Sequence, residues 1–214
     1  MPPVSQTGYA TGLASDDTEG ARLTAAAAGR AIIPAPPRST GRLASWDDRL
    51  PQLSLHTPIG DLTVSAEDGS IVAIDWGWGR DQTDTPLLRR ARDQLHRYFD
   101  GESTLFDLPL APRGTAYRQR VWAALLAIPP GTTRSYIDIA RIAGGSARSV
   151  GGANGANPIP IVIPCHRVVA TTGIGGYSGG DGLPTKRHLL QLEARASRGP
   201  PILTPHPNRT MHHP

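Results

Sequence analysis

The single cysteine of the chain, Cys165, is followed directly by His166 and Arg167. A lone thiol cannot form an internal disulfide, so it is either a small apolar packing residue or a reactive group. A cationic environment stabilises the thiolate, which is the form that attacks electrophiles. The neighbours of Cys165 therefore favour nucleophilic chemistry at this position, with inert burial as the alternative.

Two features that follow Cys165 in the sequence suit a site built around a thiol. Residues 173–182 hold six glycines in ten positions, with Tyr177 and Ser178 at their centre. A loop whose backbone approaches a ligand closely explains this composition as well as a flexible linker does. Glu193 lies near the end of a helix predicted from Pro184, where the helix dipole disfavours a carboxylate. This penalty indicates another task for Glu193, such as orienting an imidazole.

The elements before Cys165 predict a helix-turn-helix. A helix is expected over residues 115–128, and the pair Ser135 and Asp138 forms a capping box that opens a second helix ending near residue 143. Gly144-Gly145 turns the chain, and a short helix then runs over residues 147–154. Such a helix pair is also a common core element. However, the last helix carries only small residues around Arg148, so it can approach a duplex closely.

Residues 47–112 predict a small scaffold domain of strands and one helix. Alternating patterns predict strands over residues 53–56, 61–65 and 71–76, and a turn over residues 67–70. Pro86 opens a helix that runs to about Phe99 and ends at Gly101. No group of chemically active residues is recognisable in this half.

Charge divides the chain into two unlike halves. Residues 41–112 hold 7 Arg and 12 Asp and Glu, a net charge of −5, whereas residues 113–198 hold 11 Lys and Arg and three acids, a net charge of +8. The basic half is expected to meet a polyanion. The alternative is that its arginines only decorate a solvated face. Residues 1–46 and 198–214 lack periodic apolar patterns, and we expect a disordered extension and a disordered tail there.

Composition also excludes several classes of protein. No apolar run reaches the length of a membrane span, and the N-terminus lacks the pattern of a signal peptide. One cysteine among 214 residues argues against a disulfide-built secreted fold and against most structural zinc sites. We expect a soluble intracellular protein with no membrane association and no metal.

The catalytic half resembles the O6-alkylguanine-DNA alkyltransferases, also called methylated-DNA–protein-cysteine methyltransferases. The similarity covers about residues 53–193 and neither end of the chain. Six motifs in a fixed order carry it: Arg134-Ser135-Tyr136, Ala147-Arg148-Ser149-Val150-Gly151, Asn157-Pro158-Ile159-Pro160, Ile163-Pro164-Cys165-His166-Arg167-Val168, Gly176-Tyr177-Ser178-Gly179-Gly180 and Leu189-Leu190-x-x-Glu193. The weaker run Thr57-Pro58-Ile59-Gly60-Asp61-Leu62 extends it into the acidic half.

The resemblance implies an α/β (α+β) fold. A small N-terminal RNase H-like domain over residues 47–112 would precede a mostly helical, winged helix-turn-helix-like domain over residues 113–197. It also implies direct repair of double-stranded DNA containing O6-alkylguanine, and of O4-alkylthymine, by a cytoplasmic, nucleoid-associated monomer (nuclear in a eukaryote) that needs no cofactor.

The resemblance further assigns roles to individual residues. Cys165 would accept the alkyl group irreversibly and only once, His166 would act as base through a water, and Glu193 would orient the imidazole. Asn157 would brace the site, and Tyr136 would help to rotate the nucleotide and hydrogen-bond the base. Arg148 would fill the stack left by the extruded nucleotide. The base pocket would be lined by Val168, Pro160, Tyr177 and Ser178, and the DNA-binding surface would add Arg134, Ser135, Ala147, Ser149 and Gly151.

This sequence departs from the family pattern at two turns. The spacing between Tyr136 and Arg148 is about two residues short, and Asp181-Gly182 lengthen the loop before the last helix. The shorter turn could shift the recognition helix. Three alternatives remain at this point: a non-catalytic binder of alkylated DNA, a DNA-binding regulator whose Cys165 senses oxidation, and a thiol hydrolase. The presence of Cys165 argues against the first, and the Arg148 helix against the last.

Overall fold

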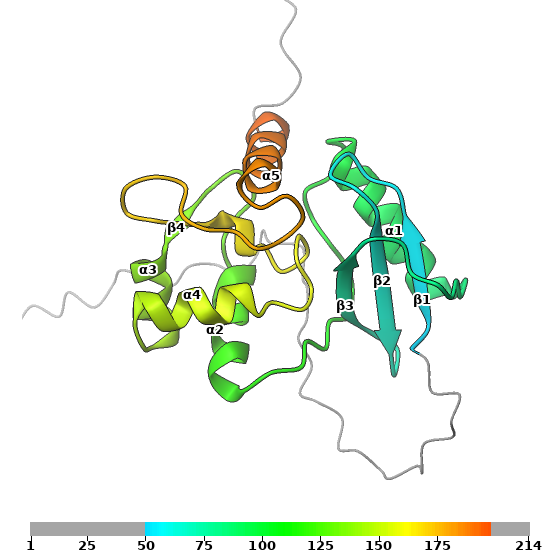
Figure 1. Ribbon diagram of the computed structural model, residues 1–214, viewed down its shortest axis with the longest axis horizontal. Helices are drawn as coiled ribbons and strands as arrows, with labels where there is room; N and C mark the ends of the chain where they lie inside the picture. Colours follow the sequence, from blue (N-terminus) through cyan, green and yellow to red (C-terminus); the bar gives the residue numbers. More distant parts are fainter. Residues whose placement is uncertain (1–49, 198–214) are drawn as a thin grey trace, which may run out of the picture.

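A three-stranded antiparallel sheet opens the computed structural model, which describes residues 50–197 (Figure 1). The expected extension over residues 1–46 and tail over residues 198–214 lie outside the described residues. The strands are β1 (Gln52–Leu55), β2 (Leu62–Glu67) and β3 (Ser70–Trp76), in the order β1-β2-β3. Asp68 and Gly69 both have positive φ, 47° and 74°, as a tight hairpin turn between twisted strands requires. The three predicted strands and this turn are therefore confirmed.

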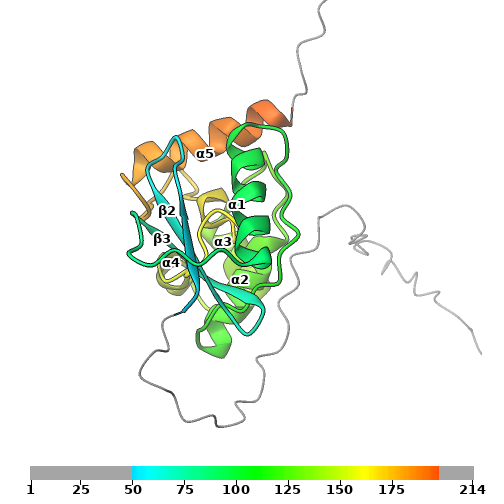
Figure 2. The same cartoon turned by 90° about the vertical axis from the view of Figure 1, so that its right-hand side faces the viewer.

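Helix α1 (Pro86–Phe99) packs against β1 and β2 and completes this half (Figures 1 and 2). Pro86 stands in the first turn, where its missing N–H costs nothing, and the Thr85 hydroxyl accepts a hydrogen bond from the Leu88 N–H. Leu88, Ala91, Leu95 and Tyr98 form an apolar stripe along α1 that is buried in the core, and Leu87 and Phe99 beside it are half-buried. The Tyr98 hydroxyl is a polar group within this stripe, and it bonds a side chain of the other half.

The second half is mostly helical. Its elements are α2 (Ala116–Leu126), β4 (Arg134–Ser135), α3 (Tyr136–Ala143), α4 (Ala147–Gly155), the 3₁₀ turn η1 (Cys165–Arg167), β5 (Val168–Val169) and α5 (Leu183–Ala196). Strands β4 and β5 form a short parallel pair, which joins the start of the helix-turn-helix to the segment after Cys165. Together the two halves confirm the mixed α/β fold expected from the sequence.

The helix-turn-helix is built by two capping boxes and a glycine turn. Ser135 and Asp138 cap α3 reciprocally, as the sequence predicts, and Ser146 with Ser149 caps α4 in the same way. A Cβ atom on Gly145 would lie 2.7 Å from the Ser149 Oγ and 2.8 Å from the hydroxyl oxygen of Tyr117, and its φ is +91°. The tight turn thus depends on glycine at this position.

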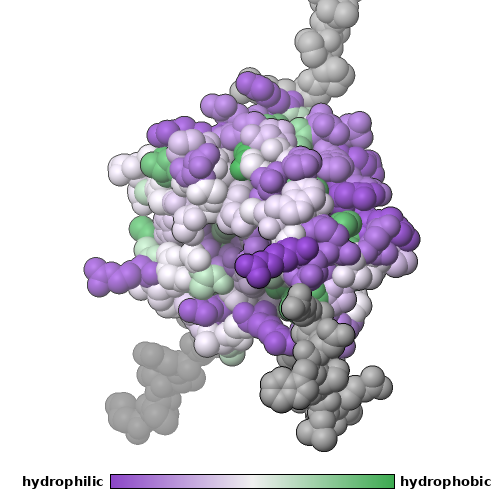
Figure 3. All heavy atoms as spheres, turned by 45° about the vertical axis from the view of Figure 1, so that its right-hand side comes forward, coloured by the Kyte–Doolittle hydropathy of each residue, from purple (hydrophilic) through white to green (hydrophobic). Residues whose placement is uncertain are grey.

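The two halves meet along one seam. The Ile74 N–H of β3 donates to the Pro158 carbonyl oxygen, and the Trp76 ring lies against the glycine loop, where a Cβ on Gly179 would come within 2.7 Å of it. In both cartoon views α5 lies at one end of the molecule, over the seam (Figures 1 and 2). The face drawn in Figure 3 is mostly hydrophilic with small scattered apolar patches. Within residues 50–197, no helix is long and apolar enough to cross a membrane.

Candidate active site around Cys165

Cys165 is the first residue of η1 and lies at the end of a tightly held turn. Its side chain is buried, with 5% of its surface exposed. The Asn157 side chain spans the turn, since its Nδ2 donates to the Ile163 carbonyl oxygen at 2.8 Å and its Oδ1 accepts from the Ile159 N–H at 3.0 Å. The Asn154 Nδ2 donates to the Cys165 carbonyl oxygen at 3.2 Å. The turn expected of Asn157 is therefore present, and Asn154 is a second brace that the sequence did not indicate.

The backbone of this turn is strained. Ile161 is buried and has a φ of +72°, a region that β-branched residues rarely adopt because the side chain crowds the backbone. A strained conformation persists only where the surroundings impose it. Here the Val162 N–H bonds back to the Pro160 carbonyl oxygen at 2.9 Å, and the Asn157 side chain holds the next residues. The position of Cys165 is thus fixed by its own loop.

The cationic environment expected around Cys165 does not come from its two sequence neighbours. In the 3₁₀ turn, the side chains of His166 and Arg167 reach Glu193 instead. Burial raises the pKa of the Cys165 thiol above its usual value, while the polar side chains of Asn157 and Tyr177 and the charge of Lys186 act in the opposite direction. The expectation that His166 and Arg167 supply the positive charge at the thiol was therefore wrong, because the side chains of adjacent residues in a tight turn point in different directions.

The Glu193 carboxylate accepts five hydrogen bonds and is fully buried. Its Oε1 accepts from the Tyr98 hydroxyl at 2.9 Å, from His166 Nε2 at 2.8 Å and from an Arg167 Nη at 2.9 Å. Its Oε2 accepts from Arg167 Nε at 2.9 Å and from the Gly131 N–H at 3.1 Å. Such charge-assisted bonds are the strong ones, so this network fixes the carboxylate in one orientation.

The protonation states follow from this network. Burial alone raises the pKa of Glu193, but the hydrogen bonds from His166 and Arg167 and the positive charge of Arg167 outweigh it and hold the pKa well below its usual range. Burial lowers the pKa of His166, against the opposing effect of Glu193, so the imidazole is neutral near pH 7. A neutral imidazole that bonds an ionised carboxylate must donate from Nε2. Its Nδ1 is then an acceptor, and it has no hydrogen-bond partner among the described residues.

Lys186 connects the two segments that flank the thiol. It is fully buried, and its Nζ donates to the Val168 carbonyl oxygen at 2.6 Å and to the Gly176 carbonyl oxygen at 3.0 Å. Burial lowers the pKa of Lys186 to about 8, while Cys165 acts to raise it. The Tyr136 hydroxyl contacts the same Gly176 oxygen at 3.4 Å, and burial and the nearby thiol raise the pKa of this tyrosine. The loop, the thiol and α3 therefore meet at one place.

Only some of the residues predicted to line a base pocket lie near the Cys165 thiol. The Tyr177 hydroxyl is buried near Cys165 but makes no hydrogen bond of ordinary geometry in the part of the chain that the structure describes. Burial, and after it the nearby thiol, raise the pKa of Tyr177. Val168 and Pro160 are buried close to Cys165 in the chain, whereas Ser178 is exposed. A buried phenol without a partner is a group that can still bind a ligand.

Most of the residues that the sequence predicts to contact DNA lie on the outside of the helix-turn-helix. Arg148, Ala147 and Arg134 are exposed, and Ser149 is exposed while its Oγ bonds the Tyr117 hydroxyl at 2.7 Å. Gly151 lies next to Tyr136, because a Cβ there would be 4.0 Å from the tyrosine ring. Ser135 is half-buried and spends its hydroxyl on capping α3. Because its neighbours on α4 have small side chains, the Arg148 side chain extends beyond theirs into solvent.

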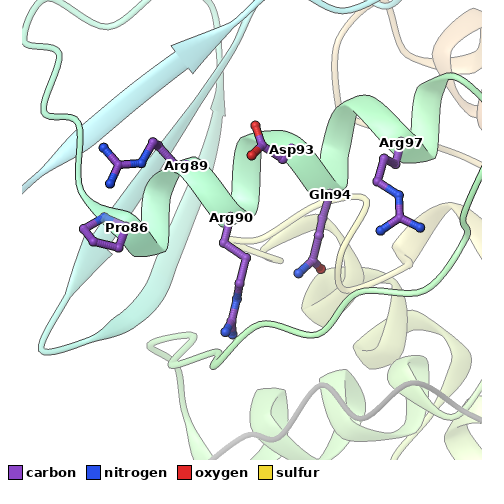
Figure 4. Close-up of a pocket in the computed structure, with 6 residues that line it drawn as sticks. All are labelled: Pro86, Arg89, Arg90, Asp93, Gln94 and Arg97. Atoms are coloured by element: carbon purple, nitrogen blue, oxygen red, sulfur yellow. The ribbon is translucent and has the colours of Figure 1, made fainter.

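Two shallow depressions lie away from Cys165. One, of about 420 Å³, runs along the charged face of α1 and is lined by Pro86, Arg89, Arg90, Asp93, Gln94 and Arg97 (Figure 4). The other, of about 520 Å³, lies where the end of α1 meets α5. Neither contains a member of the thiol, imidazole and carboxylate group, so neither is the candidate site.

Sequence reasoning missed Tyr98, Asn154 and Lys186, and it placed the charge of Arg167 at the thiol instead of at Glu193. All four are buried polar groups whose partners lie at least ten residues away in the chain. Arg167 also holds the turn before β4, because an Nη donates to the Ile128 carbonyl oxygen at 2.6 Å. The signal available was compositional, since Arg and Lys are rarely buried without a partner. A charged residue that lies in or near an apolar run of the sequence is therefore a candidate for a buried, paired group.

Comparison with known proteins agrees with this geometry. Residues 53–112 match the model of the "6-O-methylguanine DNA methyltransferase, ribonuclease-like domain", and residues 116–195 match the model of the "6-O-methylguanine DNA methyltransferase, DNA binding domain". A methylated-DNA–protein-cysteine methyltransferase of Mycobacterium tuberculosis is 46% identical over 162 residues, which span 71% of this chain and 95% of that protein. The constitutive enzyme of the same name from Bacillus subtilis is 40% identical over 152 residues, 64% of this chain and 92% of its own length.

Solved structures give the same result. The crystal structure of the Mycobacterium tuberculosis O6-methylguanine methyltransferase superimposes with a TM-score of 0.63 at 42% identity, covering 72% of this chain and 98% of that chain. A structure of the Mycobacterium tuberculosis protein in complex with DNA superimposes with a TM-score of 0.62, also at 42% identity, covering 68% and 93%.

Proposed function

This chain belongs to the 6-O-methylguanine DNA methyltransferase family, and we propose that it repairs double-stranded DNA by moving the alkyl group of O6-alkylguanine onto Cys165. O4-alkylthymine is a second substrate of the same reaction. One observation carries the proposal: a buried thiol directly precedes, in a fixed 3₁₀ turn, a neutral imidazole whose Nε2 is held by an ionised carboxylate and whose Nδ1 is left as an acceptor. This is the arrangement of an activated nucleophile with its base and the group that orients the base.

The reaction begins with removal of the thiol proton. His166 Nδ1 accepts it through one water, because Nε2 already donates to Glu193 and Nδ1 has no other partner within residues 50–197. Glu193 stabilises the imidazolium that forms, and the charge of Lys186 favours the thiolate. The role of Glu193 is orientation and electrostatic support, since the carboxylate stays ionised throughout.

Transfer is an in-line displacement at the alkyl carbon. The Cys165 sulfur forms a bond to that carbon as the bond from carbon to guanine O6 breaks, and the electron pair goes to the base. The Tyr136 hydroxyl gives its proton to the base, so that guanine leaves neutral, and the proton held by His166 returns to Tyr136 through solvent. The product is a thioether with no leaving group suited to its reversal. Each molecule therefore reacts once, as a monomer and without a cofactor.

Delivery of the base is the task of the helix-turn-helix. We assign α4 to the groove of the duplex, with Arg148 filling the stack that the extruded nucleotide leaves. Arg134, Ser135, Ala147, Ser149 and Gly151 complete the contact surface. The net charge of +8 over residues 113–198 supports this assignment, because a basic surface gains affinity by releasing counterions from DNA.

The base pocket and the domain roles follow from the same proposal. The extruded guanine lies against Val168, Pro160, Tyr177 and Ser178. Residues 47–112 serve as the scaffold domain and residues 113–197 as the DNA-binding and acceptor domain. The protein acts where its DNA substrate lies, in the cytoplasm in association with the nucleoid.

Duplex DNA with one O6-methylguanine inside a restriction site tests the proposal. The protein should restore guanine and hence cleavage of the site, in proportion to the amount of protein added. The Cys165→Ala variant should bind the same duplex but restore none of it, because only the acceptor atom is missing. Restoration by this variant would refute the assignment of Cys165. A redox-sensing regulator would instead bind undamaged DNA according to the oxidation state of its thiol.

A further inference from the structure

The N-terminal half reaches the reaction centre through one hydroxyl group. Tyr98 lies in α1, in the half that the sequence predicts to be scaffold, and its side chain is fully buried. Its hydroxyl donates to Glu193 Oε1 at 2.9 Å, across 95 residues of sequence. The ring is held edge-on against Phe99 and tilted against Phe106, both at 5.4 Å between centroids. The hydroxyl therefore has one direction in which to point, toward the carboxylate.

The bond from Tyr98 ends on the oxygen that also binds the imidazole. Glu193 Oε1 receives Tyr98, His166 Nε2 and one Arg167 Nη, whereas Oε2 receives Arg167 Nε and the Gly131 N–H. Three donors share the negative charge of this one oxygen, so each donor weakens the hydrogen bonds that the other two make with it. Removal of the Tyr98 hydroxyl would leave Oε1 to two donors and would free the carboxylate to shift toward the imidazole.

We propose that Tyr98 is a positioning residue for alkyl transfer, which fixes the Glu193 carboxylate against His166 and limits how strongly that carboxylate stabilises the imidazolium. The inference rests on the proposed function and adds to it a contribution from the other half of the molecule. Both halves then contribute to the acceptor site. The imidazole of His166, in η1, is held by Glu193 of α5, and the Glu193 carboxylate is held by Tyr98 of α1.

The protonated state of Tyr98 supports this role. Burial, and after it the charge of Glu193, raise the pKa of Tyr98 well above its usual value, so the phenol remains a donor at every working pH. The other groups that act on His166 are Glu193 and Lys186 from α5 and Arg167 from η1. All three are retained when only the phenolic hydroxyl is removed, so the Tyr98→Phe change isolates its effect.

The test compares Tyr98→Phe with the unchanged protein in reaction with free O6-benzylguanine over a range of pH. The free base needs no nucleotide extrusion, so the rate reports the acceptor site alone. The variant should react more slowly near and below neutral pH, by up to roughly tenfold, because a higher pKa leaves less of His166 neutral and able to accept the thiol proton. The midpoint of the acid limb of its rate profile should move to higher pH, because a less shared carboxylate raises the pKa of His166. Its affinity for duplex DNA should be unchanged.

Leu95→Ala is the matched control. Leu95 is buried in the same helix, one turn before Tyr98, and its loss destabilises the fold without touching the carboxylate. This variant should keep the pH midpoint of the unchanged protein. Equal profiles for Tyr98→Phe and the unchanged protein, or equal shifts in both variants, would overturn the inference. In a Glu193→Gln background, removal of the Tyr98 hydroxyl should slow transfer no further, and an additive loss would also overturn it.

A fluorinated tyrosine gives a second perturbation should Tyr98→Phe fail to fold. Placing 3-fluorotyrosine at position 98 keeps the ring and strengthens the donor, so the pH midpoint should move the opposite way, to lower pH. An unmoved midpoint would contradict the inference. Failure of the unchanged protein to transfer the benzyl group to Cys165 would refute the proposed function and this inference together. Transfer with a profile insensitive to Tyr98 would refute the inference alone.

Discussion

Glu193→Gln is the substitution to which the site should be most sensitive. The change keeps the size of the side chain and removes only its charge, while the carboxylate now accepts five hydrogen bonds from four residues in a fully buried position. The Arg167 guanidinium, whose side chain is 6% exposed, would lose its counter-charge. His166 would lose the group that fixes its tautomer and stabilises its protonated form.

The loss of stability can be worked from these contacts. Removing one partner of a buried ion pair costs about 3–5 kcal/mol, a large share of the roughly 5–15 kcal/mol that stabilises an ordinary domain. In a folded part of this size, 1 kcal/mol corresponds to about 2–4 °C, so thermal denaturation should show a fall of about 6–20 °C. The rate of benzyl transfer from free O6-benzylguanine should fall about 100-fold, because base catalysis contributes at least that factor.

The pH dependence of stability gives the sign of the effect. The pKa of Glu193 is lowered in the folded protein, so its contribution is complete above about pH 4.3, the value in an unfolded chain, and disappears only as the pH falls through the lower folded pKa. The difference in stability between the two proteins should therefore persist at pH 5 and close only in stronger acid.

A second variant separates stability from catalysis. Adding Arg167→Met to Glu193→Gln removes the unpaired charge and should recover part of the denaturation temperature, but the transfer rate should stay low. A Glu193→Gln protein that melts within about 2 °C of the unchanged one would refute the argument about stability. An undiminished transfer rate would refute the role of the carboxylate.

Three further substitutions test separate parts of the account. Arg148→Ala should slow repair in duplex DNA on the order of tenfold and leave the reaction with free O6-benzylguanine within a factor of about two, since only the duplex reaction pays for extrusion; equal losses in single-turnover kinetics would contradict its role. Lys186→Met should move the pH–rate profile of the free-base reaction to higher pH, because the ammonium group favours the acceptor thiolate; an unmoved profile would contradict that. Gly145→Ala should lower the free energy of unfolding in denaturant by about 1–3 kcal/mol and weaken binding to duplex DNA, because Gly145 has a positive φ and Tyr117 blocks the added Cβ. Gly152→Ala, on open helix surface, should be tolerated. Equal stability of the two variants would contradict this.

Local features of the fold could be predicted from the sequence. The Ser135 and Asp138 capping box, the Pro86 helix start and the Asp68-Gly69 hairpin turn all depend on residues within four positions of one another. Such signals are complete in the sequence itself. The helix-turn-helix was predictable from the Ser135 and Asp138 capping box and the Gly144-Gly145 turn, whereas its position relative to the thiol was not.

The electrostatics of the site depended on long-range pairing and were not predictable in the same way. The side chain next to the thiol in sequence, His166, reaches a carboxylate 27 residues away, and Tyr98 reaches the same carboxylate from 95 residues away. A helical apolar stripe accounts for the ring of Tyr98 but says nothing of where its hydroxyl points. For the same reason Lys186, and not Arg167, supplies the positive charge near Cys165.

Cys165 should accept one alkyl group and keep it. Mass spectrometry of the peptide that contains Cys165, after incubation with an excess of duplex DNA carrying O6-methylguanine, measures this transfer. We expect Cys165 to gain one methyl group, the amount of guanine restored to equal the amount of protein, and the reaction then to stop. An unmodified Cys165, or restoration that continues beyond one equivalent, would contradict it.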